Sequence, residues 1–168
     1  MAIYQYFLAV VPLKGIKNKH SQVPETISVN SKSQYFESDV ELYWKEAEKD
    51  VDEFLPQIDN IVNRADWVNS KTSFNWKTYS DKLDNDASIY LNEETFKIED
   101  FSFRADLREK GLIFLKNMIE LGQRNNWMFM DRQGKLLKPD FEVIKESIKN
   151  SNAYKFLKDP KGYLDSLN

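Results

Sequence analysis

Apolar and polar residues alternate without interruption from Phe101 to Arg108, in the run Phe-Ser-Phe-Arg-Ala-Asp-Leu-Arg. The odd-numbered positions are apolar, whereas the even-numbered positions are polar and three of them are charged. Successive side chains of a strand point to opposite faces of a sheet, so the pattern predicts a strand with one buried and one charged face. We expect this strand to begin near Lys97 and to anchor the sheet.

The start of the chain predicts a different kind of strand. Residues 3–11 are apolar at nearly every position and rich in β-branched and aromatic side chains, and Pro12 closes the run. Such a segment is typical of a central strand that is covered on both faces. Residues 13–36 show no strong period, so we expect a loop there, with a short strand at 26–29. Other short runs predict strands at 74–79, 87–91, 127–130 and 135–137.

Helical spacing of apolar residues begins after Ser38–Glu41, which matches the S-x-x-E capping box. Apolar residues then recur at this spacing as far as Ile58. Pro56 lies inside the pattern, so we expect it to end or kink this long helix at Leu55, with a second piece reaching about Asn63. Further helices are predicted at 109–124, from Pro139-Asp140 onward, and around 154–157.

The order of these elements predicts an α+β fold in a single domain that spans residues 1–168. A β-α-β-β-α-β core of the ferredoxin-like type fits the order, with an antiparallel sheet, helices mainly on one face and a C-terminal helical addition. An antiparallel meander with helices packed on one face is the alternative.

The composition removes several kinds of chemistry. The chain has no cysteine, which excludes disulfides, thiolate metal sites and a cysteine nucleophile. Its one histidine, His20, follows Lys17 and Lys19, and we expect a solvated loop histidine without an orienting partner. Asp81, Asp84 and Asp86 are interpreted as a turn, because the glycine and spacing of a calcium loop are missing.

Familiar catalytic motifs are also missing from the sequence: it has no phosphate-binding glycine loop, no G-x-S-x-G and no H-E-x-x-H. We therefore expect no enzyme, no cofactor and no metal site, although a carboxylate-only Mg²⁺ or Ca²⁺ site and a carboxylate-dependent enzyme stay open as alternatives.

Charge is spread unevenly along the chain. Residues 37–59 contain nine acidic and two basic residues, a net charge of −7, whereas residues 101–168 carry +4 and the whole chain −3. Glu46, Asp50 and Glu53 flank the apolar face of the first predicted helix. They are either a docking surface for a basic partner or an ordinary solvated helix face.

The charged row Arg104, Asp106 and Arg108 is the second candidate partner-binding site. Three interpretations are open for this row. The side chains line a groove or contact a partner, they form an exposed sheet face on which Asp106 screens the two arginines, or helices cover the face and the charges pair with each other. A negative net charge without a basic, aromatic strip disfavours nucleic-acid binding.

Hydropathy bears on the location of the protein. No apolar run approaches the length of a membrane span, so we expect no membrane partner. No basic residue precedes the apolar N-terminal run, which is unlike a signal peptide, and a cytoplasmic location is the expectation.

Several pieces of the second half, from about Phe101 to Leu164, carry a resemblance to a known class of proteins. They are Phe-Arg-Ala-Asp-Leu-Arg, the 114–119 helix, Trp-Met-Phe-Met at 127–130, Gly134 before Pro139, and the run from Ser151 to Pro160. This texture resembles small bacterial immunity-type proteins of polymorphic toxin systems, over less than half of the chain. The resemblance implies a non-catalytic cytoplasmic protein that binds and neutralises a toxin. A self-associating structural or regulatory module, using the outer sheet face or an exposed edge strand, is the alternative.

Overall fold

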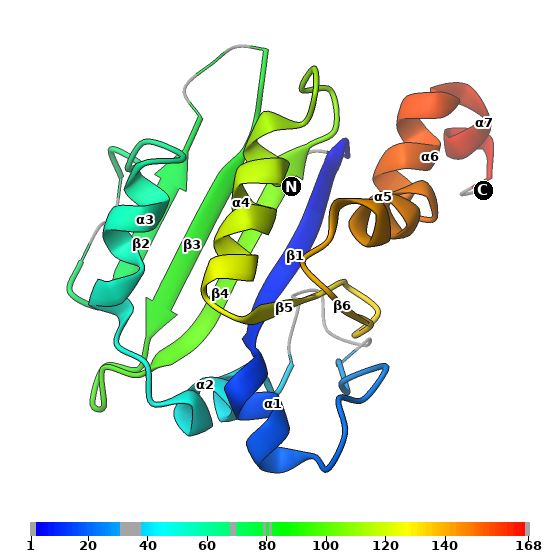
Figure 1. Cartoon of the computed structure of the whole chain (residues 1–168). Helices are drawn as coiled ribbons and strands as arrows, with labels where there is room; N and C mark the ends of the chain where they lie inside the picture. The colour runs from blue at the N-terminus through cyan, green and yellow to red at the C-terminus, as the bar shows by residue number, and fades with distance from the viewer. Residues whose placement is uncertain (1–2, 31–37, 68–69, 79, 81, 167–168) are drawn as a thin grey trace.

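Six antiparallel strands form one sheet within the described part of the chain, in the order β2-β3-β4-β1-β5-β6 (Figure 1). The computed structural model describes residues 3–30, 38–67, 70–78, 80 and 82–166. The strands are β1 Gln5–Pro12, β2 Ser73–Lys77, β3 Asp86–Leu91, β4 Ile98–Asp106, β5 Trp127–Met130 and β6 Leu136–Leu137. β1 lies between β4 and β5, which agrees with its apolar sequence and rules out a simple meander.

Helices surround this sheet. They are α1 Leu13–Lys19, α2 Val40–Ala47, the 3₁₀ helix η1 Val51–Glu53, α3 Leu55–Asp59, α4 Ile113–Arg124, α5 Phe141–Lys149, α6 Asn152–Lys158 and α7 Pro160–Asp165. The last three lie together at one side of the molecule, beyond β6 (Figure 1). The prediction of one α+β domain with an antiparallel sheet and C-terminal helices is confirmed, whereas the ferredoxin-like topology stays a prediction.

The strand β4 has the two faces that its sequence predicts. Phe101, Phe103 and Ala105 are at most 1% exposed, whereas Ser102 and Arg104 between them are half-buried. The strand pairs with β1 on one side and with β3 on the other.

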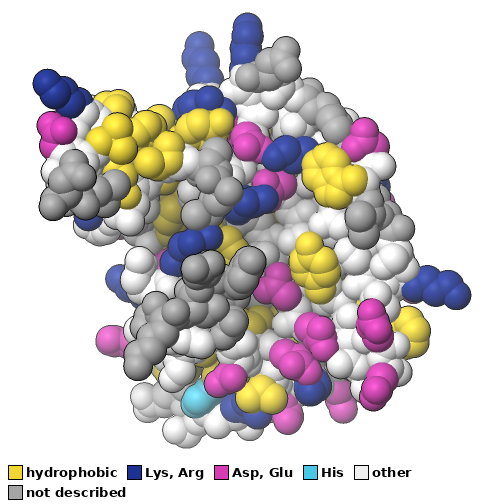
Figure 2. Space-filling view, turned by 180° about the vertical axis from the view of Figure 1, so that it is seen from behind, with side chains coloured by type: hydrophobic (Ala, Val, Ile, Leu, Met, Phe, Trp, Pro, Cys, Tyr) yellow, Lys and Arg dark blue, Asp and Glu magenta, His cyan; other side chains and the backbone are white. Residues whose placement is uncertain are grey.

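Helices α2 and α4 cover the same face of the sheet. The ring of Trp44 on α2 lies 6.2 Å from that of Phe101, and the ring of Phe114 on α4 lies 6.0 Å from that of Phe103. Phe101 and Phe103 are two residues apart on β4 and therefore point to the same side. Behind the sheet, the other face of β2, β3 and β4 carries polar and charged side chains (Figure 2), whereas Ala9 and Val11 on that face of β1 are buried.

A cluster of buried aromatic rings joins the helices to the sheet. Phe54 and Phe101 lie 5.0 and 5.2 Å from Trp127, edge to face, which is a favourable arrangement for aromatic quadrupoles. The indole N–H of Trp44 donates a 3.1 Å hydrogen bond to the carbonyl of Val10. This bond satisfies a buried polar group and fixes α2 against β1.

Both outer edges of the sheet are partly covered by extended chain. On β2, the N–H of Ala65 donates to the carbonyl of Asn75 at 2.8 Å. At the other edge, the N–H groups of Ile27 and Leu136 donate to the carbonyls of Gly134 and Glu25, both at 2.8 Å. Such cover removes main-chain groups from reach of a second sheet.

The long helix predicted from Asp39 to Leu55 is wrong, because α2 and η1 replace it. The predicted second piece does begin at Leu55, as α3, but it ends at Asp59 rather than near Asn63. α2 ends at Ala47, and the next residue, Glu48, has a left-handed φ of 53°. The side chain of Asp50 then accepts from the N–H of Asp52 and caps η1, a local bond that competes with a continuous helix. The capping box is also wrong: the residue at the N-cap of α2 is Asp39, and it makes no side-chain capping bond.

The loop predicted at 13–36 contains a helix. α1 continues directly from β1 and packs on α2, and Gly15 makes this possible because a Cβ at that position would collide with the carbonyl of Tyr43. In place of the expected strand at 26–29, the structure has isolated bridges from Thr26 to Lys135 and from Val29 to Ser38.

Candidate functional site

The acidic segment, defined here as residues 46–53, contains five acidic residues and one basic residue. Glu46, Asp50 and Glu53 are all exposed, as the sequence pattern predicts. Because the helix is broken, these carboxylates lie on the end of α2, on the following turn and on η1 rather than along one helix face. Acidic side chains gather in the lower part of the view in Figure 2, the end of the molecule at which α1, α2 and the turn between β3 and β4 lie in Figure 1.

Neighbouring residues neutralise only part of this charge. Lys49 forms an ion pair with Glu53 at 2.8 Å, and Lys14 forms one with Glu48 at 3.4 Å. Among the residues that the structure describes, the carboxylates of Glu46 and Asp52 have no ion-pair partner. Exposed pairs of this kind are weak and are screened by salt, so the segment keeps a negative potential.

Of the two arginines in the charged row, Arg104 pairs with an aspartate of the neighbouring strand β3, and Arg108 pairs with Asp106 of β4 itself. The Nε of Arg104 lies 2.7 Å from Asp86, and Lys77 pairs with both Asp84 and Asp86. The result is a network across β2, β3 and β4 on the polar face of the sheet, close to the internally paired alternative for this row. No helix is needed to supply the partners.

Asp106 is the most enclosed member of the row, with 0% exposure. It accepts hydrogen bonds from the Arg108 side chain at 2.6 Å and from the backbone N–H groups of Arg108 and Asp84 at 2.9 and 2.8 Å. Burial alone raises the pKa of Asp106, but these bonds outweigh it and hold the pKa below its ordinary value. Asp106 therefore links β4 to the residues before β3, and its buried side chain presents no surface to a partner.

Arg108 lies at the surface beside this buried carboxylate. Its guanidinium carbon is 3.3 Å from the centroid of the Tyr4 ring, and about a third of its side chain is exposed. Stacking and the bidentate pair hold the guanidinium in a fixed orientation.

The structure does not bring the two groups of candidate residues together. Asp106 is opposite Gln5 at the start of β1, whereas the acidic segment follows α2, which packs on α1 beyond the end of β1. The two groups lie at opposite ends of the sheet (Figure 1). A single partner that contacts both must span the length of the strands.

Some contributors to these sites were missed or misjudged from sequence. Asp84 and Asp86 are part of the charged network rather than only a turn, and Asp81 lies outside the described residues. His20 is half-buried, and its Nε2 lies 3.0 Å from the hydroxyl of Tyr43, so it is not a solvated loop histidine. Each of these partners comes from another element or loop of the chain, so only the tertiary structure reveals them.

The described residues contain no group of three or more histidine, aspartate or glutamate side chains placed to hold a metal ion. None of the described helices has the length and apolar character needed to cross a bilayer. In comparisons with protein-family models, with curated proteins and with solved structures, nothing matches this chain.

Proposed function

We propose that this chain is a non-enzymatic protein-binding domain of the immunity type, which binds and neutralises a cognate bacterial toxin in the cytoplasm. The observation that carries the proposal is the exposed acidic segment, where five carboxylates are accompanied by one lysine within eight residues. A surface of one sign raises the rate of encounter with a partner of opposite sign and discriminates against like-charged proteins. The partner that fits is a toxin domain with a basic surface.

Neutralisation then requires only occlusion. A domain that covers the basic surface of a toxin blocks access to that surface without any catalytic group of its own. The resemblance of the second half to immunity-type proteins supports this assignment.

A finer topological assignment belongs to the same proposal. The four inner strands follow the order β3-β4-β1-β5, with helices between β1 and β3 and between β4 and β5. This order supports a ferredoxin-like core to which β2 and β6 are added as outer strands. The cover on both outer edges counts against self-association through an edge strand.

The experiment begins with affinity capture of the tagged chain from the lysate of its native cells, followed by identification of what it retains. The captured partner is then titrated with the triple variant Glu46→Lys/Asp50→Asn/Glu53→Lys. The asparagine introduced at position 50 keeps a side-chain oxygen that can cap η1, so the turn should be preserved. We expect the association rate to fall by about tenfold or more, and its dependence on ionic strength to weaken.

A matched variant, Glu120→Lys/Asp159→Asn/Asp165→Lys, changes the charge equally at exposed positions on α4 and the C-terminal helices, outside the acidic segment. It should leave the association rate close to that of the wild type. An empty capture with folded bait, or equal rates for the two triple variants, contradicts the proposal.

A further inference from the structure

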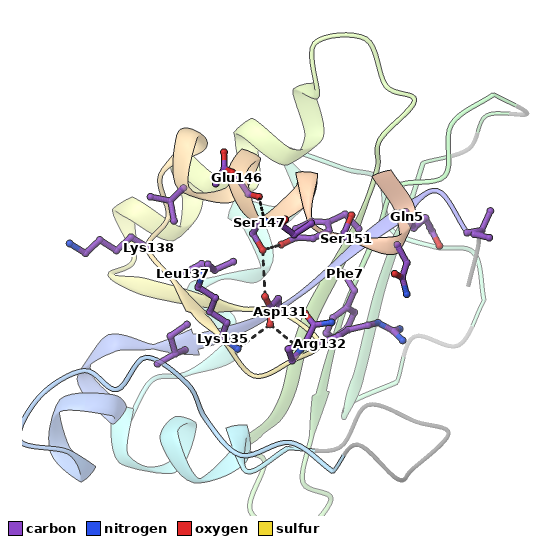
Figure 3. Close-up of a pocket in the computed structure, with 18 of the residues that line it drawn as sticks. Gln5, Phe7, Asp131, Arg132, Lys135, Leu137, Lys138, Glu146, Ser147 and Ser151 are labelled. Atoms are coloured by element: carbon purple, nitrogen blue, oxygen red, sulfur yellow. Dashed lines mark hydrogen bonds between the residues drawn. The ribbon is translucent and has the colours of Figure 1, made fainter. Parts of the chain in front are cut away.

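A cleft of about 980 Å³ opens beside β1, where β5 ends (Figure 3). It exists because β5 is short: it pairs with Ala9–Pro12 but not with the first half of β1. The chain turns away at Asp131, and α5 and α6 enclose the space that is left. The volume is at the upper end of the roughly 300–1,000 Å³ that small-molecule sites occupy in proteins.

The walls of the cleft combine apolar surface with fixed polar groups. Phe7, Leu137 and Val143 supply apolar contacts, and Ser151 and Asn150 supply hydrogen-bonding groups. Sites for small organic ligands combine apolar surface with placed polar groups, and the lining of this cleft has both, with polar and charged residues in the majority.

Arg132 supplies positive charge at the cleft. Its guanidinium carbon lies 5.1 Å from the centroid of the Phe7 ring, and Figure 3 shows the two side chains next to each other. Burial and the nearby positive charge of Arg104 both lower the pKa of Arg132. Lys135 and Lys138 also line the cleft, and they add to its positive charge.

The two carboxylates of the cleft are engaged by donors of their own. Asp131 is 6% exposed, and it accepts from the backbone N–H groups of Gln133 and Lys135 at 2.9 and 3.0 Å and from the Ser147 hydroxyl at 3.4 Å. Glu146 forms a 2.8 Å ion pair with Lys149. These bonds offset the negative charge of both carboxylates, which lessens their repulsion of a bound anion.

We propose that this cleft binds a small organic anion, with an oxyanion head on Arg132 and an aromatic or apolar body against Phe7 and its apolar neighbours. Guanidinium groups bind carboxylate and phosphate by two parallel hydrogen bonds, so both heads have the required chemistry. Phe7 adds aromatic surface to the apolar part of the lining, against which the body packs. The cleft contains no residue of the acidic segment, so anion binding and toxin binding can be tested independently.

The test uses four probes on the ¹⁵N-labelled full chain: phenyl phosphate, benzoate, benzyl alcohol and inorganic phosphate. We expect saturable amide shift changes at residues 131–138 and 146–153 with phenyl phosphate or benzoate. Benzyl alcohol lacks the charge and inorganic phosphate lacks the body, so both should bind at least several-fold more weakly. The comparison of phenyl phosphate with benzoate identifies the preferred head.

Two variants locate the binding. Arg132→Gln should weaken the preferred anion by about tenfold, and Val143→Glu, at an exposed position on α5, should weaken it through repulsion. Arg124→Gln removes an exposed arginine that does not line the cleft and should leave binding unchanged. Val143→Glu keeps the proposal testable if Arg132→Gln does not fold.

Failure of both phenyl phosphate and benzoate to bind the folded chain at millimolar concentration overturns the proposal. Equal weakening by Arg132→Gln and Arg124→Gln overturns it as well, because the binding is then unspecific attraction to positive charge.

Discussion

Replacing Asp106 with asparagine tests whether this buried carboxylate stabilises the fold by linking β4 to the residues before β3. One oxygen of Asp106 accepts from the Asp84 N–H at 2.8 Å and from the Arg108 guanidinium at 2.6 Å. Asparagine keeps one acceptor oxygen but places an N–H₂ group at the second position. The Asp84 N–H and the Arg108 guanidinium, both donors, then face another donor instead of an acceptor. We expect Asp106→Asn to destabilise the fold.

The magnitude follows from the groups left without partners. A buried N–H that loses its acceptor costs about 1–3 kcal/mol. The lost charge-assisted bond to Arg108 adds about 1 kcal/mol, a small value because about a third of the Arg108 side chain is exposed and water can replace the partner. The expected decrease in the free energy of unfolding is therefore about 2–4 kcal/mol at neutral pH.

Urea unfolding, followed by the fluorescence of the buried tryptophans, measures this difference. Asp52→Asn is the matched control, because Asp52 is exposed and should change the free energy of unfolding by less than about 0.5 kcal/mol. Equal unfolding midpoints for Asp106→Asn and the wild type would refute the reasoning, since the carboxylate would then contribute nothing to stability.

Acid provides a second measurement of the same interaction. The pKa of Asp106 is lower in the folded chain than its ordinary value of 3.8, so its ionised form stabilises the fold. That contribution is complete above the ordinary pKa and disappears as the pH falls through the folded-state pKa. The difference in stability between wild type and Asp106→Asn should therefore shrink below about pH 4.

Three further substitutions or titrations test the fold. Gly134→Ala should cost about 2 kcal/mol or more in urea unfolding, because Gly134 has φ 83° and a Cβ would collide with the Ile27 carbonyl. Gly111→Ala, at φ 79° and with only an ordinary van der Waals contact to Ile113, should cost about 1 kcal/mol. Burial raises the pKa of Tyr6 from 10.0 to about 12. The stability that its neutral form contributes should therefore be complete below pH 10.0 and be lost as the pH rises toward 12. Tyrosinate absorbance and circular dichroism, followed together, measure this loss. Trp44→Phe should cost about 1–3 kcal/mol by thermal unfolding, because it leaves a buried backbone carbonyl without its donor; an unchanged melting temperature would contradict the role of this bond.

The sequence by itself determined the elements that depend on local periodicity. The alternation around Phe101 fixes β4 and its two faces, and the apolar run that ends at Pro12 fixes a central strand. The hairpin at 127–137 and the helix beginning after Asp140 carry their own turn and cap residues. These patterns involve residues that are close together in the sequence, so they can be recognised without knowledge of the tertiary contacts.

Tertiary structure decided the features that depend on distant residues. α1 forms in a stretch without helical period because α2 packs against Gly15, and the expected long helix breaks where Asp50 caps a new turn. The sequence identified Glu46, Asp50 and Glu53 as exposed charge, since exposure of acidic residues follows from their own chemistry. It did not reveal the burial of Asp106 or the cleft beside Phe7, because both arise where segments separated by tens of residues meet.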